Sequence, residues 1–233
     1  MKQRFENMNS AEGAQRRKAE EARDRILNVA ERLFASRGFA GVSVRDITAE
    51  ADVNLAAVNY YFGSKAGLLK AVFLRRATAL NRERMAELQA VVDAHPSGAL
   101  PLPAVLRALL GPPVRWQFDP DRGLGVFIQF LARCQMEEEP ELRALFYEDV
   151  EHLRRFIPAL KRALPEMPED EICWGLHFAL GAMHHTFTHL PRLGPISQGR
   201  CHIGNRDEVI ERMVEFATGG FEAARARITA SAR

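Results

Sequence analysis

The residues best suited to specific chemistry lie together in one short stretch, SVRDITAEADVNLAAVNYYFGSK, over residues 43–65. The carboxamide of Asn59 can hydrogen-bond a base edge, and adenine N6 and N7 are the natural partners of an amide. Ala56 and Ala57 are small enough to let a helix approach the floor of a DNA groove, where they can touch a thymine methyl. The hydroxyl of Tyr60 is suited to a phosphate, or is simple surface polarity. These residue types favour readout of double-stranded DNA.

Three further polar residues stand where helices are expected to begin. Ser43 and Arg45 open one helix and Lys65 opens another, and helix starts favour a phosphate because their free N–H groups point at it. Plainer interpretations are surface polarity for Lys65 and, for Arg45, an ion pair with Asp46 or Glu50. The predicted DNA-binding residues are Ser43, Arg45, Asn54, Leu55, Ala56, Ala57, Asn59, Tyr60 and Lys65.

Local signals predict the elements that position these residues. Ser43 can cap a helix by accepting from its free N–H groups, and the apolar residues after it share one face at helical spacing. Asn54 is a second cap candidate and opens a helix over residues 55–62, which is too short to be stable without packing. Gly63 ends that helix. Two short helices and a tight turn, followed by a third helix, form the scaffold that places a recognition helix in the major groove.

Several segments of this region resemble the DNA-binding domain of the TetR family of transcriptional repressors, with no gap needed. They are RILNVAERLF (25–34), RGF (37–39), SVRDI (43–47), ADV (51–53) and YFGSK (61–65). The chain departs from the family in one place, because the family often has Tyr where Asn59 stands and the aromatic residue here follows at Tyr60. The segment VNLAAVNYYFGSK also resembles a subgroup associated with fatty-acid or acyl-CoA sensing.

The composition predicts an all-α protein and excludes several classes. The chain has 233 residues, 47% of them hydrophobic, and no strand-like alternating run. Residues 1–92 carry 16 Lys and Arg against 11 Asp and Glu, whereas residues 93–233 carry 16 against 19. A basic first part and an acidic remainder suit a DNA-binding head on a larger body. No apolar run is long enough to cross a membrane and no signal-peptide core is present, so we expect a cytoplasmic protein.

The rest of the chain is expected to form three parts: a disordered basic arm over residues 1–18, the helix-turn-helix head over 19–66 and a helical body over 67–233. A fourth helix from Ser64 to about Ala94 joins head and body, with Arg75, Arg76, Arg82 and Arg84 on a solvated face. The body is expected to contain helices over 102–111, where Gly111-Pro112-Pro113 breaks the helix, and over 141–164, 169–190 and 206–228. Cys134 and Cys173 are expected to be buried, reduced thiols.

The resemblance to the TetR family implies function for the body as well. It implies a homodimer that binds a palindromic operator, with each subunit contributing its last two long helices, about 169–190 and 206–228, to the interface. It also implies a repressor released by a small apolar effector such as a fatty acid or acyl-CoA. We expect ligand binding by Phe127, Phe130, Leu131, Arg133, Phe146, His177, Met183, His184 and Phe187. Ordinary core packing is the alternative for the aromatic residues among them.

Other functions have weaker support in the sequence. A drug-like hydrophobe could replace the acyl effector, or a metal could bind His184, His185 and His189, since an i, i+4 histidine pair can hold a transition metal. No third ligand lies close on the same helix, although Cys201 and His202 follow. We predict no metal site and no cofactor.

No phosphate loop, nucleophile elbow or zinc motif is present, which argues against an enzyme. A structural adaptor would not need the basic recognition helix.

Overall fold

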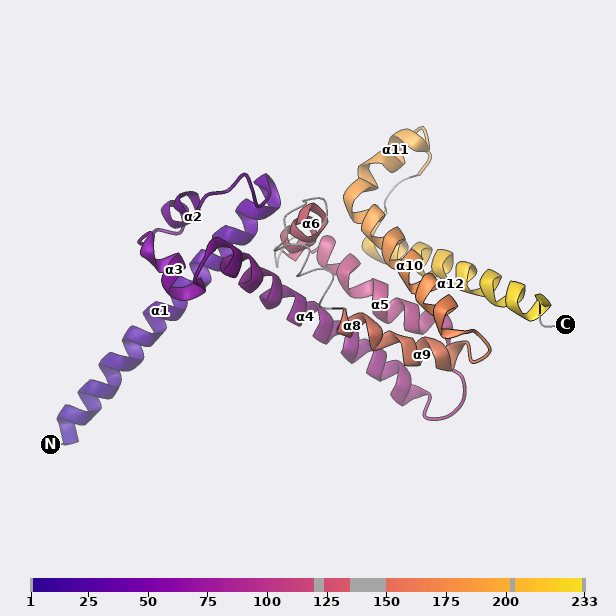
Figure 1. Ribbon diagram of the computed structural model, residues 1–233, viewed down its shortest axis with the longest axis horizontal. Coiled ribbons are helices and arrows are strands. Elements are labelled where there is room, and N and C mark those ends of the chain that lie inside the picture. Colours follow the sequence, from indigo (N-terminus) through magenta and orange to yellow (C-terminus); the bar gives the residue numbers. More distant parts are fainter. Residues whose placement is uncertain (1, 120–123, 135–149, 202–203, 232–233) are drawn as a thin grey trace. The chain divides into compact units, whose positions relative to one another are not determined.

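The computed structural model describes residues 2–119, 124–134, 150–201 and 204–231 (Figure 1). Within those ranges the secondary structure is helical and contains no strand, which confirms the predicted all-α class. The chain separates into two compact units, Met1–Arg76 and Ala77–Arg233. The division falls inside helix α4 (Lys65–Ala94), whereas the predicted boundary at residues 66/67 lies at the start of that helix.

The first unit is built from α1 (Lys2–Arg37), α2 (Val44–Glu50), α3 (Ala56–Phe62) and the beginning of α4. Its core consists of apolar residues spaced at three and four along each helix, so that one stripe of every helix faces inward. Gly38 ends α1 with a φ of 76° and donates its N–H to the Phe34 carbonyl at 2.9 Å. The fully buried members of this core are Ile26, Leu27, Ala30, Phe34, Ile47, Val58, Leu68, Leu69 and Val72.

Helix α1 begins at Lys2, so the disorder predicted for residues 1–18 is replaced by helix. The sequence there is rich in Gln, Arg, Lys, Glu and Ala and contains no proline, and these residues lose little side-chain freedom in a helix. The low apolar content of this segment favours disorder, but its high helix propensity extends the helix from its packed portion outward.

A buried ion-pair cluster joins α1 to α4 within the first unit. Glu31 is buried, and its carboxylate accepts from Arg75 Nη2 at 2.6 Å and from Arg76 Nε at 3.0 and 3.1 Å. Arg75 Nη1 also donates to Asn28 Oδ1 at 2.9 Å. The arginines predicted to form a solvated face are therefore half-buried at Arg75 and Arg76, and only Arg82 is exposed.

The second unit surrounds α5 (Leu102–Gln117), which packs against α6 (Leu124–Cys134), α9 (Phe156–Ala163), α10 (Glu169–His189) and α12 (Arg206–Ser231). Short helices α8 (Glu151–Arg154), η1 (Leu190–Arg192) and α11 (Leu193–Ile196) complete the described part. The predicted helix over 141–164 is described only from residue 150, while α10 and α12 match their predicted ranges closely. Apolar side chains fill the centre of the unit, including Val105, Leu106, Leu109, Val114, Phe156, Leu160, Ile172 and Phe221.

The prediction that Gly111-Pro112-Pro113 breaks the helix is wrong, because α5 continues through it to Gln117. Pro113 has no N–H, so the carbonyl four residues earlier, at Leu109, loses its intrahelical donor. The Nε of Arg84 on α4 donates to that carbonyl at 2.9 Å. Arg84 is consequently only 5% exposed, which corrects its predicted place on a solvated face. A buried side chain from a neighbouring helix thus supplies the hydrogen bond that the proline removes.

No helix in the described part of the chain is long and apolar enough to cross a membrane.

Candidate functional site

Helix α2 is fixed at its start by a reciprocal capping box. The Ser43 hydroxyl accepts from the Asp46 N–H at 3.1 Å, and the Asp46 carboxylate accepts from the Ser43 N–H at 2.8 Å. The Ser43 hydroxyl also donates to the Asp46 carboxylate at 2.7 Å. This bond and the one from the Ser43 N–H hold the pKa of Asp46 below its ordinary value, with smaller contributions from the charges of Arg37 and Lys65. The exposed N-terminal edge of α2 therefore has a defined backbone, as a phosphate contact requires.

The turn between the two helices is tight. Asp52 adopts a φ of 51°, a left-handed conformation that reverses the chain direction after α2. The Asn54 side-chain oxygen then accepts from the Ala56 N–H at 2.9 Å, which fixes the start of α3. Gly63 ends α3 with a φ of 75°. Asn54 therefore binds the first N–H of α3, as predicted for a cap, but the helix begins one residue later than predicted and exposed Leu55 occupies the N-cap position.

Helix α3 buries one side and presents the other. Val58 is fully buried and anchors the helix, while Ala56, Asn59 and Tyr60 are exposed and Ala57 is half-buried. Tyr60 is 83% exposed, an unusual state for so large a ring in the absence of a partner. The side chains predicted to meet base edges thus lie together on the outward side of one short helix.

The two predicted phosphate-binding cations differ in their surroundings. Arg45 is exposed and forms neither of the ion pairs considered for it, because Asp46 binds Ser43 and Glu50 pairs with Arg32. Lys65 is half-buried: its Nζ donates to the Phe39 carbonyl at 2.6 Å and lies 4.1 Å from the centre of the Phe39 ring.

Sequence reasoning missed two arginines of the head. Arg25 Nε donates to the Ala51 carbonyl at 3.3 Å, at the end of α2, and the guanidinium of Arg23 lies 5.5 Å from the centre of the Phe62 ring. Both contacts join α1 to the helix-turn-helix. Their partners lie more than 25 residues away along the chain, so no local spacing signals them.

The predicted ligand-binding residues of α6 lie in the core. Phe127 and Phe130 are fully buried and stack with ring centres 6.0 Å apart, and Trp116 meets Phe127 edge-on at 6.1 Å. The Trp116 indole N–H donates to Glu83 on α4 at 2.9 Å. The side chains of Leu131 and Arg133, and the whole of Phe146, lie outside the described residues.

The four predicted ligand residues of α10 point to different places. His177 is exposed beside Trp174 and Phe178, so it lies on the outer surface rather than in an interior tunnel. Met183 and Phe187 are partly buried against the core. His184 is half-buried, and burial lowers its pKa, with further lowering by the charges of His189 and His185.

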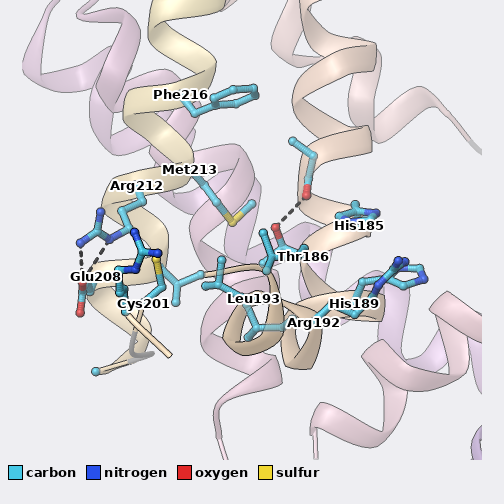
Figure 2. A pocket seen from close by; sticks show the side chains of 16 residues that line it. His185, Thr186, His189, Arg192, Leu193, Cys201, Glu208, Arg212, Met213 and Phe216 are labelled. Carbon is cyan, nitrogen blue, oxygen red and sulfur yellow. Dashed lines mark hydrogen bonds and ion pairs between the residues drawn. The ribbon is translucent and has the colours of Figure 1, made fainter. Parts of the chain in front are cut away.

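A pocket of ≈ 730 Å³ opens between α10, α11 and α12 (Figure 2). Its apolar lining includes Leu193, Ile196 and Met213. Figure 2 shows His185 and His189 on one side and the Glu208–Arg212 ion pair on the other. Hydrogen bonds from Arg212 to Glu208 raise the pKa of the arginine. None of the nine predicted ligand residues lines this pocket, because the turn after α10 that forms it gave no sequence signal.

A second hollow of ≈ 620 Å³ lies between α10 and α12. It is bordered by large apolar side chains with unusual exposure: Trp174 is 58%, Phe178 63% and Phe216 72% exposed. Phe216 lines both hollows, so they lie next to each other along α12. An apolar surface of this kind is typical of a protein–protein interface.

The histidines and cysteines do not form a metal site in the described ranges. His185 and His189 stack with ring centres 4.6 Å apart, but no group of three or more His, Cys, Asp or Glu side chains is close enough to hold a metal ion there. His202 lies outside the described residues. Cys173 is exposed, contrary to the predicted burial, because it lies beside Trp174 on the uncovered side of α10.

Comparison with known proteins identifies both halves of the chain. Residues 26–72 match the family model for bacterial regulatory proteins of the tetR family, and residues 107–220 match that for the tetracyclin repressor-like C-terminal domain. The probable HTH-type transcriptional regulator YttP of Bacillus subtilis is 48% identical over 48 residues, 21% of this chain and 23% of YttP. The chain matches between 23% and 38% of the length of its curated relatives.

Two solved structures share the fold. NalD of Pseudomonas aeruginosa, the secondary repressor of the MexAB-OprM multidrug efflux pump, is 20% identical with a TM-score of 0.59, covering 87% of this chain and 97% of NalD. A candidate fatty acid metabolism regulator from Clostridium perfringens is 17% identical with a TM-score of 0.57, covering 84% of this chain and 97% of that protein.

The chain belongs to the TetR family of bacterial transcriptional regulators, because family models match both its head and its body. TetR family members are DNA-binding regulators, which confirms the prediction that this protein is not an enzyme.

Proposed function

We propose that this protein binds a DNA operator through α2 and α3 and represses transcription there. The observation that carries the proposal is the exposed surface of α3, where Asn59 and Tyr60 stand beside Ala56 on a helix anchored by Val58. An amide, a phenol and a small methyl side chain on one short helix suit the edges and backbone of a major groove. Such a regulator acts in the cytoplasm, where the bacterial chromosome lies.

Two copies are expected to act together. One head reads only a few base pairs, whereas two heads about 34 Å apart, or a multiple of that, read a palindrome. The proposed interface is formed by residues 169–190 and 206–228, in α10 and α12. The exposed rings of Trp174, Phe178 and Phe216 support this, since a second copy would cover them.

The effector is proposed to be a small apolar molecule such as a fatty acid or acyl-CoA. The segment VNLAAVNYYFGSK and the largely apolar body support this class, as does the fold shared with a candidate fatty acid metabolism regulator. Release of DNA requires that the effector bind the released conformation more tightly than the DNA-bound one, because equal affinity shifts nothing.

A fluorescence anisotropy titration of the purified protein with DNA from upstream of its own gene tests the proposal. We expect tight binding that weakens with salt. Tyr60→Ala should weaken binding at least about tenfold if the ring and hydroxyl contact the operator. Arg154→Ala, which removes an exposed cation of the second unit, is the matched control and should leave the affinity unchanged.

The same titration with dodecanoate and dodecanoyl-CoA tests the effector. Release by either compound supports the acyl class. If DNA binding is unchanged by both compounds, the proposed DNA-binding function stands and the acyl class of effector is rejected. If no upstream fragment binds, a selection from random DNA follows, and failure there would reject DNA binding itself.

A further inference from the structure

Arg84 occupies an unusual position for a charged residue. It lies on α4 with 5% of its surface exposed, in the interior of the second unit. One of its donors has a structural task, because Nε supplies the hydrogen bond that Pro113 denies to the Leu109 carbonyl. A neutral amide or hydroxyl could perform that task, and burying a full positive charge for it is costly.

The charge of Arg84 has no carboxylate partner among the described residues. The nearest acidic side chains in sequence are engaged elsewhere: Glu83 accepts from Trp116, and Glu87 accepts from Arg115. Nη2 reaches only the sulfur of Met183, at 3.8 Å, and sulfur is a weak acceptor. Nη1 has no hydrogen-bond partner within the described ranges. The end of the guanidinium, formed by its two terminal nitrogens, therefore has unused donors.

The guanidinium remains a cation at neutral pH. Burial lowers the pKa of Arg84 to about 10, and no neighbouring charge contributes to that shift. Roughly three units separate this pKa from pH 7, so protonation persists. A permanent buried cation with free donors favours an anion that brings its own negative charge.

The two residues that Arg84 contacts, Leu109 and Met183, belong to the apolar core of the second unit or pack against it. Met183 on α10 and the Leu109 turn of α5 flank it, and α10 and α5 are the helices that α6 packs against with its buried Phe127 and Phe130. Two parallel N–H groups facing outward from one guanidinium match the two oxygens of a carboxylate, which they bind in a bidentate manner. An apolar chain attached to that carboxylate would pack against apolar side chains.

We propose that Arg84 binds the carboxylate of the effector, so that the protein responds to free apolar acids and discriminates against neutral molecules of the same shape. This inference rests on the proposed apolar effector and specifies its chemical class. It also favours a fatty acid over acyl-CoA, because a thioester has no carboxylate at that end. Since α4 continues into the first unit, an acid that engages Arg84 acts on the helix that leads to the DNA-binding head.

Isothermal titration of the full-length protein with dodecanoate, methyl dodecanoate, 1-dodecanol and dodecanoyl-CoA tests the proposal. In the unmodified protein we expect dodecanoate to bind at least about tenfold more tightly than the ester or the alcohol, the usual size of a charge-assisted hydrogen bond. Arg84→Gln should remove that preference while leaving the affinity for 1-dodecanol unchanged, and Arg84→Lys should retain part of it. Arg82→Gln, on the exposed side of the same helix, is the matched control.

The outcomes separate the two proposals. The inference would be wrong if the unmodified protein bound the acid and the neutral compounds with equal affinity, or if Arg84→Gln lowered the affinity for all of them equally. Arg84 would then serve only the Leu109 carbonyl, and the proposed apolar effector would still stand. Tight binding of dodecanoyl-CoA alone would also overturn it. If none of the four compounds binds, both the apolar effector and this inference fail. If Arg84→Gln does not fold, the comparison of acid with ester in the unmodified protein decides.

Discussion

At the scale of single residues, glycines in α10 show how closely the helices of the body approach one another. A Cβ placed on Gly175 would overlap the ring of Phe221 on α12, and that ring is buried and held by its surroundings. A Cβ on Gly181, six residues later in the same helix, would meet nothing within 4 Å. Both positions are glycines of the same helix, but Gly175 has no room for a side chain and Gly181 has. They therefore form a matched pair for substitution.

Gly175→Ala should lower the free energy of unfolding by about 1–3 kcal/mol, because the new methyl group forces α10 and α12 apart. Gly181→Ala should instead raise it by about 0.5–1 kcal/mol, since alanine is the better helix former and no neighbour is displaced. Denaturant unfolding at one fixed protein concentration measures both. Similar changes in the two variants would contradict the proposed close approach at Gly175.

At the scale of elements, the joint between α1 and α4 depends on one buried carboxylate. Glu31 receives hydrogen bonds from Arg75 and Arg76, and its side chain is almost completely buried while the two arginines keep some contact with water. Removal of the negative charge would leave two cations close together at the surface of the head.

Glu31→Gln should therefore destabilise the protein by about 2 kcal/mol, below the value for a fully buried pair because water screens the arginines. Thermal unfolding followed by circular dichroism gives the change. Glu20→Gln, which alters an exposed pair with Arg16, is the control and should change stability by less than about 0.5 kcal/mol. A loss no larger in Glu31→Gln than in this control would show that the cluster adds little.

Some elements of this fold can be predicted from the sequence and others cannot. The helix-turn-helix could be predicted because residues at its helix ends determine where the helices begin and stop. Ser43 caps α2, Asn54 binds the first N–H of α3 and Gly63 ends α3. The course of α5 through Pro112 and Pro113 could not, because its missing hydrogen bond is supplied by Arg84, 25 residues away along the chain. The pocket at the end of α10 was missed for a similar reason, since three separate helices contribute to it.

At the scale of the whole molecule, the uncovered aromatic side chains of α10 and α12 bear on assembly. Trp174 and Phe178 stack with ring centres 5.6 Å apart and border a hollow whose other side includes Gly219 and Gly220. A ridge of rings beside a hollow on one surface can pair with a copy of itself, as a two-fold interface requires.

Phe178→Asp should convert the proposed dimer to a monomer, because each copy would bury an unpaired carboxylate in the proposed interface. Sedimentation velocity at micromolar concentration shows the change, and operator affinity should fall with it, since a monomer has one head. Val150→Asp, which places the same charge on an exposed apolar residue before α8, should remain dimeric. A dimeric Phe178→Asp would exclude α10 as the centre of the interface.

The hydrogen bond between Arg84 and the Leu109 carbonyl also constrains how this chain can change through evolution. With proline at position 113, replacing Arg84 by a residue that has no side-chain donor leaves a buried carbonyl without a hydrogen bond, so the substitution is harmful in that background. If Pro113 is first replaced by a residue with an N–H, the helix bonds that carbonyl itself and position 84 loses this constraint. The order of the two steps decides whether the intermediate survives. Descendants of this protein should therefore lose the proline before the arginine, and positions 84 and 113 should vary together.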